Sequence, residues 1–280
     1  MLTFLTPPHE LLDAASPDGH TGAVLAYFEP RYEADAAPDE TQPYWRPRPG
    51  ELDQRLSADP RDYPTTILTS KILKIIHETN LFQLNPRVLE IGGAEGLEAV
   101  RFALMGAQVD VCELTKNGVR KTEALAEKYG VSDKVRARRC PAQELQLEDG
   151  VYGLVLNRGV LDYVKTARNK REIIRRTQLA TAPGGLHVFA AWSEDTQPVV
   201  PCHSEVEMYP DYQGAISLAE YRRPGWQILF STFEEKPDHS HRECADQPHT
   251  HTHLKLIAQR LGSGALMDSG MSNLQAIIAA

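Results

Sequence analysis

A regular alternation of strand-like and helix-like segments through the middle of this chain constrains its fold more than any other feature. Short apolar segments typical of strands are separated by longer segments with helical periodicity. The expected strands are residues 87–91, 108–113, 135–139, 152–157 and 186–192, and the expected helices are residues 65–82, 97–105, 116–129 and 169–181. Strands that alternate with helices of about a dozen residues predict βαβ units and a parallel sheet.

The alternation breaks after residue 192. Residues 227–234 and 251–259 favour two β-strands that form a C-terminal hairpin joined to the sheet. The pattern Ser217-Leu-Ala-Glu220 is typical of a capping box and predicts that a short helix begins there. We therefore expect an α/β fold with a Rossmann-like, doubly wound, mostly parallel seven-stranded sheet that includes a C-terminal antiparallel hairpin.

The N-terminal segment, residues 1–64, is rich in proline, acidic and aromatic residues, which predicts a cap with few long elements. We expect the main domain over residues 65–262, with an insert at about 195–225, and a tail over 263–280. The cap contributes four aromatic side chains that either form a lid over a ligand or pack against the sheet, namely Tyr27, Tyr32, Tyr44 and Trp45.

Composition limits the partners. The formal net charge of −8 argues against nucleic acid as the main partner, because phosphates are bound by clustered Lys and Arg. We interpret the basic run at residues 168–176 as a solvated helix face. No segment is apolar enough to span a bilayer, and the sequence leaves the oligomeric state open. The four cysteines form no CxxC pair, which favours a reducing, cytoplasmic location.

A glycine-rich turn after the first expected strand, residues 90–96 (EIGGAEG), is the strongest candidate for a ligand site. Glycines at such a turn let the backbone approach a nucleotide closely, and the next helix directs its N-terminus at the ligand. The second expected strand ends in Glu113, whose carboxylate can accept both hydroxyls of a ribose. These features predict a ligand that contains a nucleoside.

A nicotinamide-dependent oxidoreductase is the first alternative, and the glycine spacing disfavours it. Counted from Gly92, the third residue of the G-x-G-x-x-G pattern is Ala94 and the sixth is Leu97. Glu90, on the first expected strand, would also repel a diphosphate, whereas it suits a cationic amino-acid group.

The combination resembles the class I S-adenosylmethionine-dependent methyltransferases. Glu90, Gly92 and Gly96 match the family's first motif, with Ala94 in place of its middle glycine. Residues 157–161 (NRGVL) resemble the motif after the fourth strand, and residues 226–254 faintly resemble the tellurite-resistance type of small-molecule methyltransferase. The resemblance implies S-adenosylmethionine as cofactor, bound by Glu90, Gly92, Gly93, Gly96, Glu113, Leu114, Ala142, Gln143, Asn157 and Arg158.

One position departs from the family's pattern. Many members place an Asp after the third strand to bond the adenine amino group, and Pro141 stands there in this chain. The backbone N–H of Ala142 and the side chain of Gln143 are the remaining candidates to bind adenine.

The resemblance implies methyl transfer to a small-molecule metabolite. The expected catalytic residues are Asp162, Tyr163 and Ser193, with Asp162 as a base, as an ammonium partner or simply as a helix-terminal acid. Trp192 is expected either to line the acceptor pocket or to belong to the core. Enzymes that cyclise or cleave S-adenosylmethionine and release methylthioadenosine remain an alternative, as does a binding module without activity.

Histidines gather near the C-terminal hairpin. On a strand, the side chains of His249, His251 and His253 would share one face. Their spacing, together with that of residues 239–244, matches no known zinc motif, so we expect no metal. His187 lies early in its strand and is expected to be buried structure.

Overall fold

The computed structural model of the chain describes residues 19–32, 66–193, 208–238, 249–262 and 274–279. The helices are α1 (Gly19–Phe28), α3 (Ile67–Thr79), α4 (Leu81–Leu84), α5 (Leu97–Leu104), α6 (Lys116–Lys128), α7 (Ala167–Ala180), α8 (Ala215–Tyr221) and α9 (Leu274–Ala279). The strands are β1 (Arg87–Ile91), β2 (Gln108–Glu113), β3 (Val135–Arg139), β4 (Tyr152–Arg158), β5 (Thr181–Trp192), β6 (Trp226–Asp238) and β7 (His249–Arg260). Single 3-10 turns are η2 (Pro30–Tyr32), η3 (Ala142–Glu144), η4 (Leu161–Tyr163) and η5 (Tyr212–Gly214).

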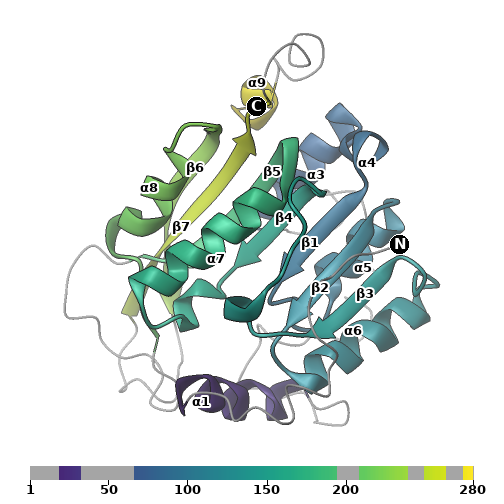
Figure 1. Cartoon of the computed structure of the whole chain (residues 1–280), viewed down its shortest axis with the longest axis vertical. Coiled ribbons are helices and arrows are strands. Elements are labelled where there is room, and N and C mark those ends of the chain that lie inside the picture. Colours follow the sequence, from purple (N-terminus) through teal and green to yellow (C-terminus); the bar gives the residue numbers. More distant parts are fainter. Residues whose placement is uncertain (1–18, 33–65, 194–207, 239–248, 263–273, 280) are drawn as a thin grey trace. The chain divides into compact units, whose positions relative to one another are not determined.

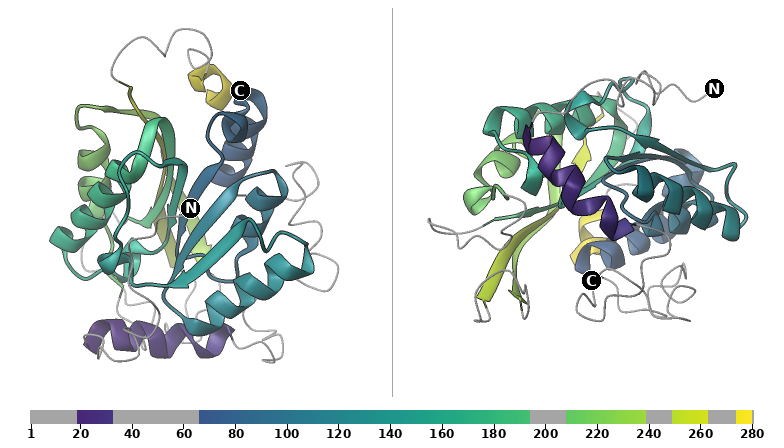
Figure 2. Two further views of the ribbon diagram at one scale, coloured as in Figure 1. Left: turned by 45° about the vertical axis from the view of Figure 1, so that its right-hand side comes forward. Right: turned by 90° about the horizontal axis from the view of Figure 1, so that it is seen from below.

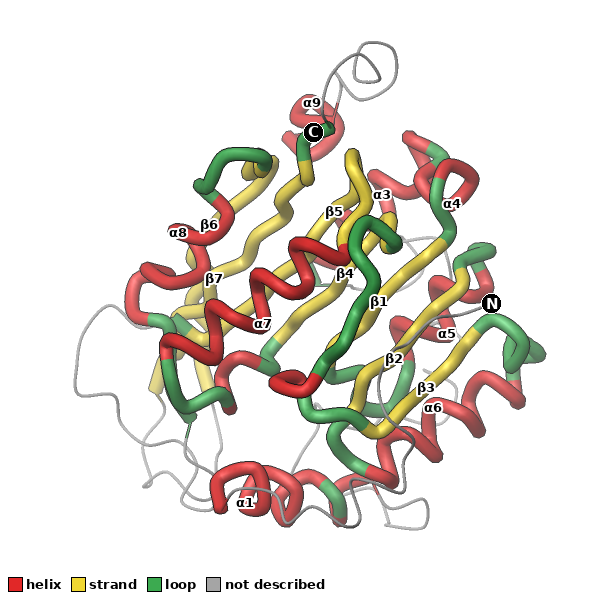
Figure 3. The backbone as a smooth tube through the Cα atoms, in the orientation of Figure 1, coloured by secondary structure: helices red, strands yellow, loops and turns green. Residues whose placement is uncertain are grey.

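The strands form a seven-stranded sheet in the order β3-β2-β1-β4-β5-β7-β6 (Figure 1). β2 runs parallel to both β1 and β3, and β4 runs parallel to β5. β7 runs antiparallel to β5 and to β6, so the last two strands make the expected hairpin (Figure 3). The predicted fold class, a mostly parallel sheet with a C-terminal antiparallel hairpin, is confirmed.

The chain forms two compact units, residues 9–140 and residues 141–280 together with 1–8. In the first unit, α5 and α6 pack on β2 and β3 around side chains that water does not reach, among them Val88, Leu89, Val100, Phe102 and Val111. In the second unit, α7 packs on β5 and on α8, over a core that includes Leu154, Ile174, Phe189 and Leu256. Within the described residues, no helix has the length and apolar character needed to cross a membrane.

Residues 65–82 form two helices where the sequence predicts one. The Thr66 side chain accepts a hydrogen bond from Thr69 N (3.2 Å) and caps α3. Asn80 adopts a left-handed backbone conformation (φ 53°) that ends α3. A second helix, α4, begins at the next residue, Leu81. Asn tolerates this conformation better than most residues, so a single position interrupts an otherwise periodic pattern.

The predicted short helix exists, but the prediction that Ser217 caps it is wrong. α8 begins at Ala215, and Gly214 stands at its N-cap position in place of Ser217. The carboxylate of Asp211 accepts bonds from Ile216 N (2.9 Å), from Ser217 N (2.8 Å) and from the Ser217 hydroxyl (2.6 Å). A carboxylate that precedes the 3-10 turn and reaches forward past it therefore satisfies the free N–H groups that a local Ser was expected to satisfy.

β5 also begins earlier than predicted, at Thr181, directly after α7. Its register with β4 shifts between Tyr152 and Leu154, so residues 183–185 (PGG) form a bulge inside the strand. Gly184 has a φ of 80°, and a Cβ on Gly185 would lie 2.9 Å from the Tyr152 carbonyl oxygen. Glycine is required at both positions to let the bulge form.

His187 is buried, as its sequence position predicts. Its Nδ1 lies 2.6 Å from the Tyr221 hydroxyl, and its Nε2 lies 2.7 Å from Thr181 Oγ1. Burial lowers the pKa of His187 to about 3, because the charged imidazole would lose its hydration.

This burial makes the stability of the fold depend on pH. An unfolded chain protonates this side chain below its ordinary pKa of 6.5, whereas the folded chain does so only near 3. Stability contributed by His187 is therefore present above pH 6.5 and is lost as the pH falls from 6.5 towards 3. At pH 5 the loss should be about 2 kcal/mol.

We expect His187→Gln to lose less unfolding free energy than the wild type between about pH 7.5 and pH 5, as measured by urea denaturation. Equal losses in the two proteins would show that His187 does not control this pH dependence.

Candidate active site

The turn between β1 and α5 has a backbone that favours glycine. The φ angles of Gly92, Ala94 and Gly96 are 71°, 49° and 80°. Ala94 takes this conformation at a cost of roughly 1 kcal/mol. A Cβ on Gly96 would lie 2.6 Å from Thr122 Oγ1, and one on Gly93 would lie 2.3 Å from a valine methyl group of β2. The predicted turn is therefore closely packed against β2 and α6.

The carboxylate of Glu113, at the end of β2, binds this turn. Its Oε2 accepts a bond from Ala94 N (2.9 Å), and its Oε1 accepts bonds from the N–H (2.9 Å) and the hydroxyl (2.8 Å) of Thr115. Burial raises the pKa of Glu113, and the bonds from Thr115 and Ala94 oppose that shift. A ribose hydroxyl would share Oε2 with the Ala94 N–H. The role of Glu113 as ribose ligand stays a prediction, and its role in holding the turn was not foreseen.

The buried acid of β1 and the hydrogen bonds between the ends of β2 and β3 complete the surroundings of the glycine turn. Glu90 is buried on β1, and its Oε2 lies 3.6 Å from the point where a Cβ on Gly93 would stand. The acid of the expected motif therefore faces the glycine turn. At the ends of β2 and β3, Arg139 Nε donates to the carbonyl oxygen of Leu114 (3.2 Å), and the Cys112 thiol donates to the carbonyl oxygen of Cys140 (2.9 Å). These bonds tie the ends of β2 and β3 together.

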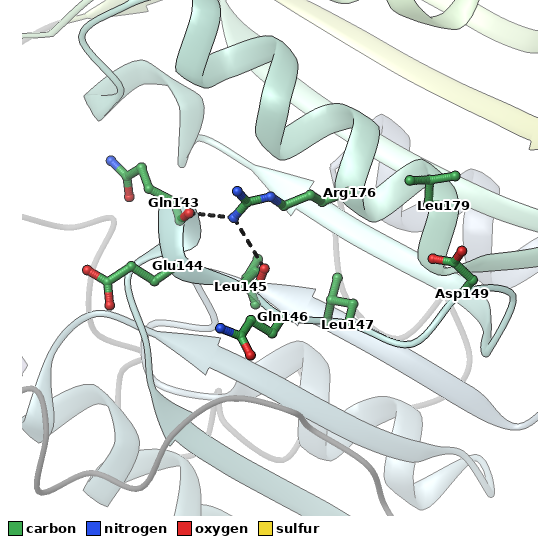
Figure 4. Close-up of a pocket in the computed structure, with 8 residues that line it drawn as sticks. All are labelled: Gln143, Glu144, Leu145, Gln146, Leu147, Asp149, Arg176 and Leu179. Atoms are coloured by element: carbon green, nitrogen blue, oxygen red, sulfur yellow. Dashed lines mark hydrogen bonds between the residues drawn. The ribbon is translucent and has the colours of Figure 1, made fainter.

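In the second unit, the predicted adenine-binding residues lie on η3. Ala142 is buried, and the carbonyl oxygen of Gln143 accepts a bond from the Arg176 guanidinium (2.6 Å). Figure 4 shows the Gln143 side chain pointing away from Arg176. A hollow of about 630 Å³ lies between this segment and α7, and sequence reasoning missed it. It is lined by Gln143, Glu144, Leu145, Gln146, Leu147, Asp149, Arg176 and Leu179.

Asn157, near the end of β4, is a buried amide that has no hydrogen-bond partner among the described residues. Its side chain is 3% exposed, and among the described residues neither its oxygen nor its nitrogen has a hydrogen-bond partner. An unsatisfied buried amide costs roughly 1–3 kcal/mol, so such a group in a folded protein calls for an explanation. A polar ligand at this strand end would satisfy it. Arg158, the next residue, is half-buried.

Asp162, on η4, is buried and bonded to the end of β5. Its Oδ1 accepts a bond from Trp192 N (2.8 Å), and its Oδ2 lies 3.7 Å from where a Cβ on Gly159 would stand. Burial raises the pKa of Asp162 to about 7, against the opposing effects of the Trp192 N–H and the Lys170 ammonium. The Asp162 carboxylate thus bonds to the end of β5 and changes its charge near neutral pH, while its catalytic role stays a prediction. Tyr163, beside it on η4, is half-buried.

Ser193 is engaged by the fold itself. Its fully buried hydroxyl donates to the carbonyl oxygen of Asp211 (2.7 Å) and accepts from Gly214 N (2.8 Å). The Trp192 ring is buried and meets His251 edge to face at 5.1 Å between ring centres. These contacts favour structural roles for Ser193 and Trp192, and the catalytic role of Ser193 stays a prediction.

The remaining predicted positions fall partly outside the described residues. Tyr44, Trp45 and residues 239–248 are not described, and neither is the side chain of His249. In the part of the chain that is described, no group of three or more His, Cys, Asp and Glu side chains could hold a metal ion.

Comparison with known proteins places this geometry in a family. A methyltransferase domain model matches residues 89–189. The tRNA 5-carboxymethoxyuridine methyltransferase of Escherichia coli O157:H7 is 30% identical over 185 residues, which cover 56% of this chain and 68% of that protein. This chain belongs to the class I S-adenosylmethionine-dependent methyltransferases. The membership predicted from the glycine turn and Glu113 is confirmed.

Solved methyltransferase structures share the fold. A protein from Methanosarcina mazei, described as a SAM-dependent methyltransferase, superposes with a TM-score of 0.54 at 15% identity and covers 68% of this chain and 98% of its own. The 1,6-didemethyltoxoflavin-N1-methyltransferase of Burkholderia thailandensis superposes with a TM-score of 0.54 at 14% identity and covers 89% of this chain and 92% of its own. At these identities the likeness concerns the fold alone.

We expect Glu113→Gln to weaken cofactor binding by about tenfold to a hundredfold, because it removes a charged acceptor worth roughly 1.5–3 kcal/mol. Isothermal titration with S-adenosylhomocysteine measures this. Glu127→Gln, an exposed position on α6, is the matched control and should bind like the wild type. A folded Glu113→Gln protein with unchanged affinity would contradict the assignment of Glu113 as cofactor ligand.

Proposed function

We propose that this methyltransferase transfers the methyl group of S-adenosylmethionine to a small-molecule acceptor. The observation that carries the cofactor assignment is the left-handed turn of residues 92–96, bound through Ala94 N to the Glu113 carboxylate. The close approach at Gly93 and Gly96 suits a nucleoside ligand, and the acid Glu90 beside the turn suits a cationic amino-acid group. When bound, S-adenosylmethionine supplies a methyl group activated by a sulfonium.

Asp162 is our candidate for the base that receives a proton from the acceptor. A pKa of about 7 leaves a useful fraction of the carboxylate ionised at neutral pH, and its Oδ2 lies beside the glycine after β4. We propose that Asn157 uses its unsatisfied amide to orient the cofactor or the acceptor. Orientation alone can contribute roughly 7–11 kcal/mol to such a reaction.

Burial and charge support a small acceptor. Asn157 and Asp162 are 3% and 4% exposed, so an acceptor that reaches them must enter the protein. A net charge of −8 disfavours long contacts with a polyanion.

An RNA acceptor is the second candidate, because the bacterial relative is named for a tRNA nucleoside. A basic cluster also favours it. Arg175 pairs through two nitrogens with Glu220 (both 2.9 Å), and Arg223 (3.0 Å) and Arg171 (3.9 Å) lie against the same carboxylate. Glu220 is buried under three partly exposed arginines, so this face of α7 and α8 is locally positive. Part of the run interpreted as a solvated face is therefore an ordered arginine cluster.

The reaction is tested first with S-adenosylmethionine alone, with the nucleosides identified by mass spectrometry. Intact cofactor supports a methyltransferase that waits for its acceptor. Methylthioadenosine above the uncatalysed background would overturn methyl transfer in favour of cyclisation or cleavage of the cofactor.

The acceptor class is tested next with cofactor labelled in the methyl group. The protein is incubated in parallel with a bacterial metabolite extract and with total tRNA. We expect label in small molecules together with S-adenosylhomocysteine. Label in acid-precipitable RNA alone would overturn the small-molecule proposal.

The pH profile tests Asp162. A base must be ionised to accept a proton. We therefore expect kcat/KM, measured with the acceptor that the labelling experiment identifies, to rise with pH through about 7 and then to level off. Asp162→Asn should lower kcat by roughly a hundredfold to ten-thousandfold and remove this rise. Asp133→Asn, an exposed position before β3 that lines no candidate site, is the matched control. A variant that keeps the wild-type profile would exclude Asp162 as the base.

A further inference from the structure

Glu29 joins the N-terminal segment to the start of a helix far along the chain. It follows α1 directly, and its Oε2 accepts a bond from Lys116 N and its Oε1 from Asn117 N, both at 2.9 Å. The Asn117 side chain donates back to the carbonyl oxygen of Glu29 at 3.0 Å. Figure 2 shows the turn after α1 beside the beginning of α6. Three hydrogen bonds thus connect positions 87 and 88 residues apart.

The bonded groups are those that a helix leaves free. The first N–H groups of α6 have no partner inside the helix and carry partial positive charge, so a carboxylate is the favoured acceptor. Thr115 accepts from Gly118 N (3.0 Å) and caps the helix from its own strand end. Glu29 supplies the acceptor for the two N–H groups that Thr115 does not reach.

These bonds lie beside the expected cofactor acid. The Thr115 hydroxyl that caps α6 also donates to Glu113 (2.8 Å), and Glu113 in turn holds Ala94 N (2.9 Å). The first turn of α6 therefore lies between two sets of hydrogen bonds, one to Glu29 and one that runs from Thr115 through Glu113 to the glycine turn. A change in position of the N-terminal segment would thus act on the same helix end that supports the turn.

The segment that carries Glu29 is packed. The rings of Phe28 and Tyr32 stack at 6.1 Å between centres, and Tyr27 meets Phe28 edge to face at 4.9 Å. Tyr27 and Tyr32 are 8% and 5% exposed, and η2 contacts α6. Both tyrosines of this segment that the sequence offered as lid residues are thus buried in the structure.

We propose that Glu29 is a positioning residue for the cofactor. Its carboxylate fastens the N-terminal helix to the α6 N-terminus, and it thereby supports Thr115 and Glu113, which hold the turn expected to bind the cofactor. This inference rests on the proposed use of S-adenosylmethionine. It assigns Glu29 no contact with the reacting atoms.

Glu29→Gln tests the proposal, because it keeps the shape, removes the charge and turns an NH₂ group towards a helix N–H. We expect the dissociation rate of S-adenosylhomocysteine, followed by stopped flow, to rise by about tenfold, with little change in the association rate. Asn117→Ala should act in the same direction. The control is Glu123→Gln, at an exposed position of α6, which should dissociate like the wild type.

Hydrogen exchange, followed by mass spectrometry, separates this role from a purely structural one. We expect the cofactor product to slow exchange over residues 19–32 and 116–118 in the wild type, and Glu29→Gln to abolish that protection. A lower melting temperature with an unchanged dissociation rate would overturn the proposal and leave Glu29 a structural cap. A wild type that binds no S-adenosylhomocysteine would overturn the proposed function and the positioning role together. In that case, faster exchange of residues 116–118 in Glu29→Gln than in the wild type would still show that Glu29 bonds to the start of α6.

Discussion

The bond between the Glu113 carboxylate and Ala94 N holds the glycine turn after β1 against the end of β2. Ala94 has a φ of 49°, a conformation that alanine rarely adopts, and the bond fixes it there. Gly118 completes the arrangement, because a Cβ at that position would lie 2.9 Å from the Ala94 carbonyl oxygen and 2.8 Å from Glu113 Cγ. One buried acid, one strained turn residue and one glycine on α6 therefore have to fit together.

Periodicity predicted the fold well where neighbouring residues determine the element. β2 and β3 have the predicted bounds, since each is a short apolar or alternating run between a helix and a turn. The errors occur where a distant or strained group decides. Asn80 divides a continuous helical pattern, and Asp211 replaces Ser217 as the cap of α8. The bulge in β5 depends on Gly184 in a left-handed conformation, which the pattern of apolar residues does not reveal.

The candidate site was predictable to the extent that a motif lies within one turn. The glycines and Glu113 could be assigned because one βαβ unit brings them together. The role of Glu29 could not be predicted in this way, because Glu29 lies 87 residues from Lys116 and acidic residues are abundant in the N-terminal segment. Ser193 appeared suitable for catalysis from its place at a strand end. Only the structure shows that both Asp211 and Gly214 already use its hydroxyl.

The environments of two buried acids suit them to different tasks. Burial raises the pKa of both, but Glu113 receives bonds from Ala94 and Thr115, which favour its charged form. Asp162 receives one bond, from the Trp192 N–H, and lies near the charge of Lys170, and its pKa reaches about 7. Burial in turn lowers the pKa of Lys170. More donors make Glu113 the better permanent acceptor, while fewer donors leave Asp162 able to take up and release a proton. Methyl transfer to an acceptor that carries a proton can use both kinds of acid. In the proposed reaction, Glu113 would hold the cofactor throughout the cycle, and Asp162 would take up a proton and release it again in each turnover.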